Sequence, residues 1–583
     1  MTQPSNETPR PPTGDTPPES RRESAVGDCV AAGVIALLLA VVVTFEISHW
    51  AGFRLSVTPG FDMRTYVDHA FGISEGTWPD EKPFYRAPLY PYALAMMMTA
   101  GRTMFGVALI QSLLYALTVV LVMLAARLSG GRAAGWIAAS CLILYGGAMY
   151  FVTVLHSAIV EMFLAALFMY VWIVLCQRLK WFNAANIDDE KTRSVEINRI
   201  RILSVCAGIA FTLLCLIRPN FLIIAPVAAL GMVLEARPGH RAWTFRQMLF
   251  GGIACCLLLG LVVIRNNQYS DDFVTLTTNA KTTYYNSNCD DSMVFNFRYP
   301  KGKLMSPTTG AYWKHQARKA VGYWRSFEFP QNVNYYLYRD ASGTLQILRL
   351  PFAIIGAAFL LGCIRLRRQF RELWPYLAMF WLYYGSIVPF FVIGRFRLPA
   401  VPAMCIIVAI CVVSVARDWN RHRGVVGAYV LAFVILALAM RPGEIYKTSQ
   451  DYRNVGLAAL EFGDAAGAES AFRESLARHY SNDGAMFLAS AYIMQDKADA
   501  ALAVLTELRQ KNPDAMEFVK SEITLLRYLD RETDAKALAA QVPPDILVAA
   551  DDVLPMYTAD FRQTAAEQPE KLNAFVATGG LEK

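Results

Sequence analysis

Charged residues are scarce in this chain. Only 18% of its 583 residues are Asp, Glu, Lys or Arg, while 55% are hydrophobic, and soluble domains average about 25% charged residues. Long apolar runs with almost no charge recur up to residue 440, as is typical of membrane spans. This composition excludes a soluble enzyme and predicts an all-α, polytopic membrane protein.

The chain also lacks a set of cysteines outside its apolar runs. Of 11 cysteines, only Cys289 falls in a long hydrophilic stretch, so we expect no extracytoplasmic disulfide within one chain. No basic stripe with interleaved aromatic residues accompanies the net charge of +7, which argues against a nucleic-acid partner. The acidic and histidine residues show no firm metal-ligand spacing. We therefore predict no structural metal and name no certain cofactor, although a divalent cation stays open.

Eleven apolar windows are long enough to cross the hydrocarbon core of a membrane. They lie at 29–47, 107–127, 132–150, 155–177, 201–217, 219–235, 246–264, 346–364, 373–393, 398–416 and 424–440. The loops dense in Lys and Arg are 178–201, 237–246, 365–371 and 417–423. With a cytoplasmic N-terminus, all four loops face the cytoplasm, as the positive-inside rule requires. The sequence thus predicts a multi-pass protein of the plasma (inner) membrane.

The predicted spans divide the chain into three parts. Residues 1–28 are rich in Pro, Ser, Thr, Glu and Arg, which predicts a disordered cytoplasmic tail. Residues 29–440 form the transmembrane domain, with external loops at 51–106 and 265–345. Within the first loop, the stretch 88–100 is apolar but short and interrupted by proline, so we expect it to be interfacial or re-entrant.

The third part, residues 445–583, is predicted to be a separate helical domain outside the cytoplasm. Its composition shifts to Ala, Glu, Leu and Arg, and Ala468 is matched by Ala501, 33 positions later. This spacing resembles that of tetratricopeptide repeats, in which small residues let antiparallel helices pack closely. An ordinary helical bundle is the alternative. Because repeat arrays form concave peptide-binding surfaces, we expect a protein partner at this domain.

Ionisable residues gather on the external side, in the 51–106 loop and at the external ends of later spans, where they are costly and are therefore functional candidates. These candidates, with one tyrosine beside them, are Asp62, Tyr66, Asp68, Arg86, His156, Glu161, Arg218, Arg265, Arg395 and Arg397. External loops should be poor in arginine, so an anionic ligand such as a lipid phosphate would explain the arginines. The alternative is that each arginine reaches the headgroups or pairs with an acidic residue.

Several segments resemble the GT-C superfamily of integral membrane glycosyltransferases, in particular its family-39-like, dolichyl-phosphate-mannose-protein mannosyltransferase type. They are GFDMRTYVDHA, KPFYRAPLYPYALA, IRPN (217–220), VIRNN (263–267), DFVTLTTN (272–279) and RFRLPAVP (395–402). The resemblance implies an enzyme that takes a sugar from a polyprenyl-phosphate carrier. It would transfer this sugar, usually with inversion, to a protein, lipid or glycan acceptor at the external membrane face.

The resemblance also implies roles for the candidate residues. Asp62 falls on the loop carboxylate of such enzymes, which acts as general base or positions the acceptor, and a carboxylate suits the removal of a hydroxyl proton. Its alternative role is to cap a helix. The other candidates are assigned to substrate binding, with Arg395 and above all Arg397 on the carrier phosphate. A lipid-linked glycan polymerase or ligase, or a flippase, is the alternative function.

Two features depart from the family pattern. Pro88 is preceded by Arg86 and Ala87, where relatives that transfer aminoarabinose carry an acidic residue. The long external loop is often glycine-rich in the family, whereas residues 279–289 read NAKTTYYNSNC. We therefore expect substrate recognition in this loop to have diverged.

Overall fold

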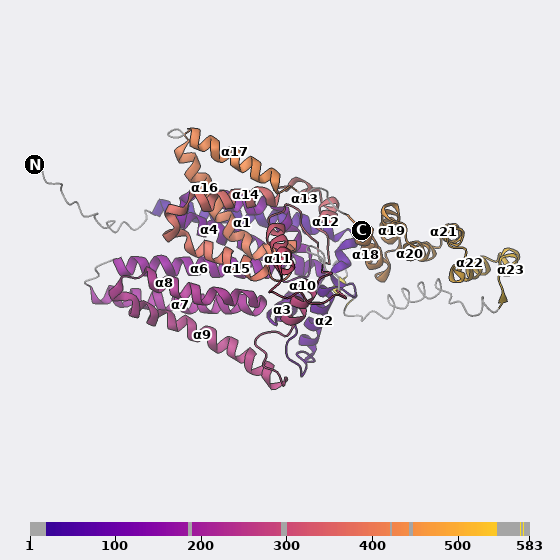
Figure 1. Ribbon diagram of the computed structural model, residues 1–583, viewed down its shortest axis with the longest axis horizontal. Coiled ribbons are helices and arrows are strands. Elements are labelled where there is room, and N and C mark those ends of the chain that lie inside the picture. Colours follow the sequence, from indigo (N-terminus) through magenta and orange to yellow (C-terminus); the bar gives the residue numbers. More distant parts are fainter. Residues whose placement is uncertain are drawn as a thin grey trace, which may run out of the picture.

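The computed structural model describes residues 19–184, 189–292, 300–330, 332–419, 423–441, 447–544, 572, 575 and 576. Every regular element in these residues is a helix. A bundle of long helices forms one end of the molecule, short helices follow, and a row of helical hairpins forms the other end (Figure 1). Of the predicted tail 1–28, residues 1–18 lie outside the described residues, and helix α1 begins within the rest at Glu19.

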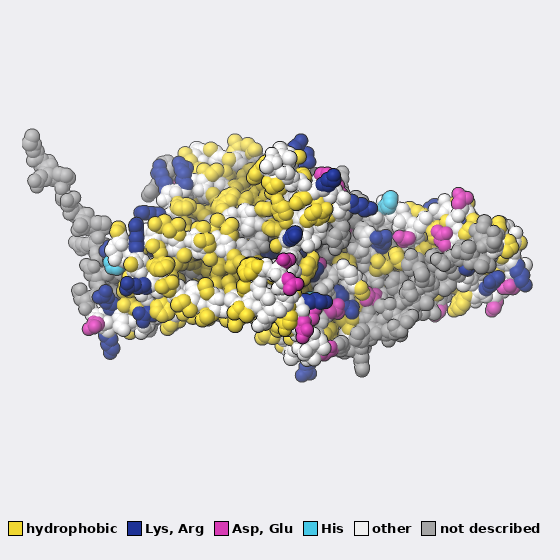
Figure 2. All heavy atoms as spheres, turned by 60° about the horizontal axis from the view of Figure 1, so that its bottom comes forward, with side chains coloured by type: hydrophobic (Ala, Val, Ile, Leu, Met, Phe, Trp, Pro, Cys, Tyr) yellow, Lys and Arg dark blue, Asp and Glu magenta, His cyan; other side chains and the backbone are white. Residues whose placement is uncertain are grey.

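The bundle consists of long apolar helices. They are α1 (Glu19–Ser48), α4 (Met104–Leu144), α6 (Ala158–Ala184), α7 (Glu190–Ile217), α8 (Ile224–Glu235), α9 (Arg241–Gln268), α14 (Phe352–Arg365), α15 (Phe370–Ile387), α16 (Val401–Asp418) and α17 (Arg423–Ala439). Within the described residues, 6 helices are long and apolar enough to cross a membrane, and three shorter apolar helices accompany them. Figure 2 shows hydrophobic side chains over a broad part of the face of the bundle that it presents. The chain is an all-α, polytopic membrane protein.

Helix α4 explains why the ten helices of the bundle accommodate eleven predicted windows. Its 41 residues are two helices joined at Gly131, whose φ of 83° is a left-handed conformation that glycine adopts readily. The two halves run side by side, since the Tyr115 hydroxyl donates to the Leu142 carbonyl oxygen over 2.8 Å. The windows 107–127 and 132–150 thus begin in separate halves of α4, and the other windows fall on the remaining helices of the bundle.

The four basic loops meet at one end of the bundle. Lys180, at the end of α6, donates to the Arg371 carbonyl oxygen over 2.8 Å and pairs with Glu235 at 3.0 Å. Arg365 pairs with Asp418 and so joins the 365–371 loop to the remaining loop, 417–423. Lys and Arg side chains cover this end of the molecule in Figure 2. Like-charged loops therefore share one face, as the positive-inside pattern predicts for a single membrane side.

Short helices cover the opposite end of the bundle. They are α2 (Asp62–Glu75), α3 (Leu89–Gly101), α5 (Gly146–Met149), α10 (Asn279–Asn288), α11 (Gly310–Tyr323), α12 (Tyr335–Ala341) and α13 (Gly343–Ile347).

Six 3-10 segments complete the described part of the membrane domain: η1 (Ala51–Val57), η2 (Tyr150–Thr153), η3 (Pro219–Ile223), η4 (Pro238–His240), η5 (Arg367–Gln369) and η6 (Gly394–Ala400). Helix α3 occupies the predicted interfacial stretch and has 13 residues, fewer than a straight span requires.

Three helical hairpins follow the bundle. They are α18 (Ser449–Glu461) with α19 (Ala465–Arg478), α20 (Asn482–Ile493) with α21 (Ala498–Lys511), and α22 (Met516–Tyr528) with α23 (Glu532–Ala539). Small residues allow the close packing in the first hairpin, because a Cβ atom at Gly456 would lie 2.6 Å from the Phe472 ring. Ala468 and Ala501 are both fully buried. Between residues 449 and 539 the described chain therefore consists of paired helices.

Candidate active site

A cavity of about 440 Å³ lies at the end of the bundle that carries the short helices. Helix α6 shows which end this is. Glu161 in its first turn lines the cavity, whereas Lys180 near its other end contacts the basic loops. Seven of the ten candidate residues line this cavity: Asp62, Tyr66, Arg86, His156, Glu161, Arg218 and Arg395. They come from α2, the 80–88 loop, the start of α6, the end of α7 and η6. The tertiary structure thus brings together residues that are more than 300 positions apart.

Asp62 is held between two arginines. It is the first residue of α2, and because Phe61 is the N-cap, Asp62 does not cap the helix. Instead, Arg86 Nη2 donates to Asp62 Oδ1 over 2.7 Å, and Arg395 Nη2 lies 3.5 Å from Oδ2. Burial tends to raise the pKa of Asp62, but the positive charges of Arg395 and Arg86 outweigh it and hold this pKa below its usual value. Asp62 is therefore a carboxylate at neutral pH.

A second carboxylate closes the network around the cavity. Glu161 is buried; its Oε2 lies 3.4 Å from Arg218 Nη1, and its Oε1 accepts a hydrogen bond from the Ser157 hydroxyl over 2.6 Å. The Ser157 hydroxyl also lies 3.2 Å from His156 Nδ1, and Arg395 contacts His156 Nε2. A continuous chain of polar contacts therefore joins Asp62 to Glu161 through Arg395 and His156.

The charge of this network is positive. His156 is buried, and its imidazole Nε2 contacts Arg395. Three arginines then face two carboxylates, which leaves one unbalanced positive charge at the cavity wall. In a partly desolvated site this charge favours an anion, and guanidinium groups match phosphate oxygens in geometry.

An aromatic wall lies beside Asp62. The Tyr66 ring is one helical turn from Asp62 and packs edge-on against Tyr90, with ring centroids 4.9 Å apart. The Arg86 guanidinium carbon lies 5.4 Å from the centre of the Tyr66 ring. Burial raises the pKa of Tyr66, so its phenol stays protonated. This ring offers an apolar face and a hydroxyl to a ligand in the cavity.

Three candidate residues lie outside the cavity. Asp68 is exposed and pairs with Arg64 at 2.8 Å, since it lies on another face of α2. Arg265 donates to the carbonyl oxygens of residues 80 and 82 over 2.7 and 2.8 Å and thereby holds the loop before Arg86. Arg397 is fully buried, donates to the Phe327 carbonyl oxygen over 3.1 Å and lies 3.5 Å from Glu328. Their contacts are with the protein itself.

Polar residues that we did not single out in the sequence also line the cavity. They are Ser157, Asn220, Thr277, Asn279, Thr282, Thr283, Asn286 and Asn332. Most lie within 277–286, so the density of Thr and Asn in that hydrophilic stretch is the one signal that could have found them. Uncharged donors and acceptors of this kind suit the hydroxyl groups of a sugar.

No group of three or more His, Cys, Asp or Glu side chains with the geometry to hold a metal ion is found among the described residues. Asp62 and Glu161 are each engaged with arginine. The 11 cysteines are all free thiols.

Comparisons with protein-family models and with curated proteins gave no match. Among solved structures, the chain is similar to ArnT from Cupriavidus metallidurans bound to undecaprenyl phosphate, with 12% identity and a TM-score of 0.42 over 94% of this chain and 77% of that one. It is also similar to the Archaeoglobus fulgidus oligosaccharyltransferase in the apo form, with 16% identity and a TM-score of 0.40 over 79% of this chain and 59% of that one. A third similar structure is AglB from Archaeoglobus fulgidus in complex with an inhibitory peptide and a dolichol-phosphate, with 14% identity, a TM-score of 0.37 and the same coverage of 79% and 59%.

Proposed function

We propose that this protein is a membrane glycosyltransferase of the GT-C type, with a polyprenyl-phosphate-linked sugar as donor. The observation that carries this function is the cavity in which Asp62 lies between Arg86 and Arg395 at the end of an apolar helical bundle. A lipid-linked donor requires a phosphate site at the membrane boundary and a carboxylate beside the sugar. The six family-like segments quoted above support the same assignment, including its family-39-like character.

The proposed reaction uses the charges of the cavity directly. The acceptor hydroxyl oxygen bonds to the anomeric carbon while the bond from that carbon to the carrier phosphate oxygen breaks. The hydroxyl proton passes to Asp62, and the leaving phosphate keeps the bonding electron pair and gains negative charge. Arg395 and Arg86 stabilise this charge as it develops. Attack opposite the leaving group inverts the anomeric configuration.

Glu161 and Arg218 form the second wall of the proposed site. Because Glu161 is buried and paired with Arg218 at 3.4 Å, we assign this pair to holding the cavity wall and positioning His156 rather than to proton transfer. Tyr66 and the Thr and Asn residues of 277–286 would contact the sugar. The acceptor is a protein, a lipid or a glycan.

We further propose that the cavity opens on the extracytoplasmic side of the plasma membrane. The clustering of the basic loops at the other end of the bundle supports a cytoplasmic N-terminus and an extracytoplasmic domain over 445–583. The hairpin architecture and the 33-residue spacing of Ala468 and Ala501 support a tetratricopeptide-like repeat there. A protein partner would bind this domain.

The Asp62→Asn variant tests the proposed reaction. Asparagine keeps the size of the side chain but cannot accept the proton, so sugar transfer should fall by about 100-fold or more while donor binding survives. Transfer is measured with purified protein and radiolabelled polyprenyl-phosphate sugars, and binding with the same donors.

Asp68→Asn is the matched control for Asp62→Asn. Asp68 lies on the same helix but is exposed and paired with Arg64, so its variant should transfer sugar at nearly the parental rate. Near-parental transfer by Asp62→Asn would overturn its role as the base. Transfer only from diphosphate-linked donors would move the function to a polymerase or ligase.

A further inference from the structure

A second cavity lies on the other side of η6 from the first. Its volume is about 620 Å³, and it is bounded by α14, α17 and the loop that carries Ser326 and Glu328. Arg395 of η6 lines the first cavity, whereas Arg397 of the same segment pairs with Glu328, which lines the second. The Arg397 and Glu328 pair thus stands between the two cavities.

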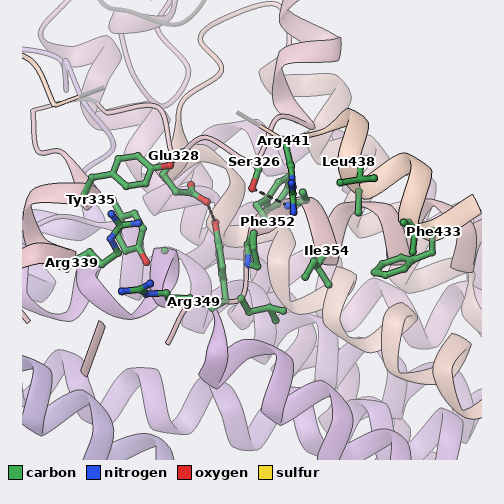
Figure 3. A pocket seen from close by; sticks show the side chains of 18 residues that line it. Ser326, Glu328, Tyr335, Arg339, Arg349, Phe352, Ile354, Phe433, Leu438 and Arg441 are labelled. Carbon is green, nitrogen blue, oxygen red and sulfur yellow. Dashed lines mark hydrogen bonds between the residues drawn. The ribbon is translucent and has the colours of Figure 1, made fainter. Parts of the chain in front are cut away.

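One end of the second cavity is cationic. Arg339, Arg349 and Arg441 line it, and Glu328 is the one acidic side chain in its described lining. Glu328 already accepts a hydrogen bond from the Tyr145 hydroxyl over 2.6 Å and faces Arg397 at 3.5 Å. Its charge is therefore compensated within the protein. In Figure 3, Arg339 and Arg349 lie together at this end of the cavity, and Arg441 lies apart from them, between Ser326 and Leu438.

The other end of the second cavity is apolar. Phe433, Val434, Ala437 and Leu438 of α17 and Ile354 of α14 form this wall. In Figure 3, Ile354, Phe433 and Leu438 lie on the side away from Arg339 and Arg349. Val434 and Leu438 are 44% and 50% exposed, so this wall opens toward the hydrocarbon that surrounds a membrane-spanning helix. A ligand here would meet cations at one end and hydrocarbon at the other.

The position of the arginines sets the depth of such a ligand. Pro351 directly precedes α14, and Arg441 follows α17, so the cationic end lies where the apolar helices end. This is the level at which a lipid headgroup sits, and guanidinium groups bind phosphate oxygens with charge-assisted hydrogen bonds. Arg339 lies 3.6 Å from Asp340, whereas Arg349 and Arg441 have no acidic partner among the described residues, so a neutral lipid would leave these two charges uncompensated.

From this arrangement we propose that the second cavity binds an anionic lipid, with its headgroup in the part of the cavity that the arginines line and its hydrocarbon chain along α14 and α17. The site is separate from the first cavity and does not depend on glycosyl transfer. A bilayer phospholipid and a polyprenyl phosphate share this chemistry.

The test measures lipid retention on the purified full-length protein by native mass spectrometry. The probes are phosphatidylglycerol, undecaprenyl phosphate, phosphatidylcholine and inorganic phosphate. The parent protein should retain phosphatidylglycerol or undecaprenyl phosphate, and the Arg349→Gln/Arg441→Gln double variant should retain about tenfold less. Arg318→Gln/Arg368→Gln, which removes two exposed arginines elsewhere, should retain as much as the parent.

A second variant tests the apolar wall independently of charge. Ala437→Trp fills the space beside α14 and should also lower retention of both anionic lipids. Preference for phosphatidylglycerol would assign the site to a bilayer lipid, and preference for undecaprenyl phosphate would assign it to the carrier; either supports an anionic lipid. Three outcomes would overturn the assignment. The parent protein could retain phosphatidylcholine as well as it retains the anionic lipids, or inorganic phosphate alone could displace the lipid completely. The double variant could also retain as much lipid as the parent.

Discussion

Arg395 and Arg397 lie two residues apart but have different surroundings. Both belong to η6, and in a 3-10 helix residues two apart point in different directions because a turn takes about three residues. Arg395 reaches the first cavity, where it contacts His156 and Asp62. Arg397 is fully buried and faces Glu328. The first is placed to meet a ligand and the second to hold the fold.

The two arginine variants should therefore fail in different ways. Arg397→Ala leaves Glu328 buried without its cation and should destabilise the protein by about 3 to 5 kcal/mol. Arg395→Ala should remain folded and lose donor binding, with only partial rescue by Arg395→Lys because an ammonium lacks the guanidinium fork. Thermal unfolding and donor binding are measured on each variant.

Replacing both members of the buried pair provides the control. In Arg397→Met/Glu328→Gln no charge remains unpaired, so much of the lost stability should return. A stable Arg397→Ala protein that no longer binds donor would instead assign Arg397 to the carrier phosphate, as the sequence interpretation had it.

Lys319 is a buried lysine whose charge is unfavourable. It lies on α11, is fully buried and donates to Asn288 Oδ1 over 3.0 Å. Burial lowers its pKa to about 7, so between about pH 7 and its ordinary value of 10.5 the unfolded chain binds more protons than the folded protein does. The free energy of unfolding therefore rises with pH across this range, because the cost of burying a charged lysine disappears. As the pH falls toward 7, this gain in stability is lost.

The Lys319→Met variant isolates this pH dependence. The parent should gain thermal stability relative to the variant between pH 7.5 and 9.5, by at most about 1.4 kcal/mol per pH unit. Other titrating groups are common to both proteins and cancel in the difference. Parallel stability curves for the two proteins would show that Lys319 is charged in the folded state.

At the scale of elements, the first C-terminal hairpin connects the membrane domain to the hairpins that follow. Val455 and Ala458 of α18 pack in the same hydrophobic core as the bundle. The opposite side of the hairpin, with Leu460 of α18 and Phe472 of α19, packs in a second core that it shares with α20 to α23. Arg54 of η1 pairs with Asp464 at 3.4 Å, and Asn334 donates to Asp451 over 3.0 Å. The α18 and α19 hairpin therefore supports η1, the segment that leads into Asp62.

Two truncations should separate these roles. Removal of residues 481–583 leaves α18 and α19 in place, so the membrane domain should stay folded and transfer sugar to a small acceptor. Removal of residues 445–583 exposes Val455's partners and breaks the contacts of Arg54 and Asn334, which should lower the melting temperature by several degrees. Equal melting temperatures for both truncations would place the domain boundary before α18, as the composition predicts.

At the scale of the whole molecule, charge and cavities are segregated along the bundle. The basic loops form one end, both cavities lie toward the other, and the apolar helices separate them (Figures 1 and 2). Such an arrangement allows a lipid-linked ligand to enter from the membrane while its phosphate meets arginines at the boundary.

Reporter fusions test the orientation of this axis. A periplasmically active phosphatase fused after residue 440 should be active, and fusions within 180–199 or 365–371 should be inactive, because the basic loops face the cytoplasm. A fluorescent reporter that folds in the cytoplasm should give the reverse pattern and serves as the control. Phosphatase activity both after residue 440 and within 180–199 or 365–371 would contradict the predicted orientation.

The sequence by itself determined the class of the fold. Apolar runs long enough to cross a membrane must form helices, because only internal hydrogen bonding satisfies the backbone in hydrocarbon. The break at Gly131 and the hairpins after α18 follow likewise from local signals, glycine and small residues at repeat spacing. Local physics was sufficient for these features.

Only the tertiary structure decided which charged residues share a site. The sequence placed ten candidates on the external side of the membrane, but whether an arginine faces a cavity depends on the direction in which its segment points. That direction is fixed by packing between distant elements, as when η6 turns Arg395 toward Asp62 and Arg397 toward Glu328. The placement of residues 277–286 at the first cavity and the second cavity beside α17 also arise from such long-range packing. The sequence shows only that 277–286 is rich in Thr and Asn.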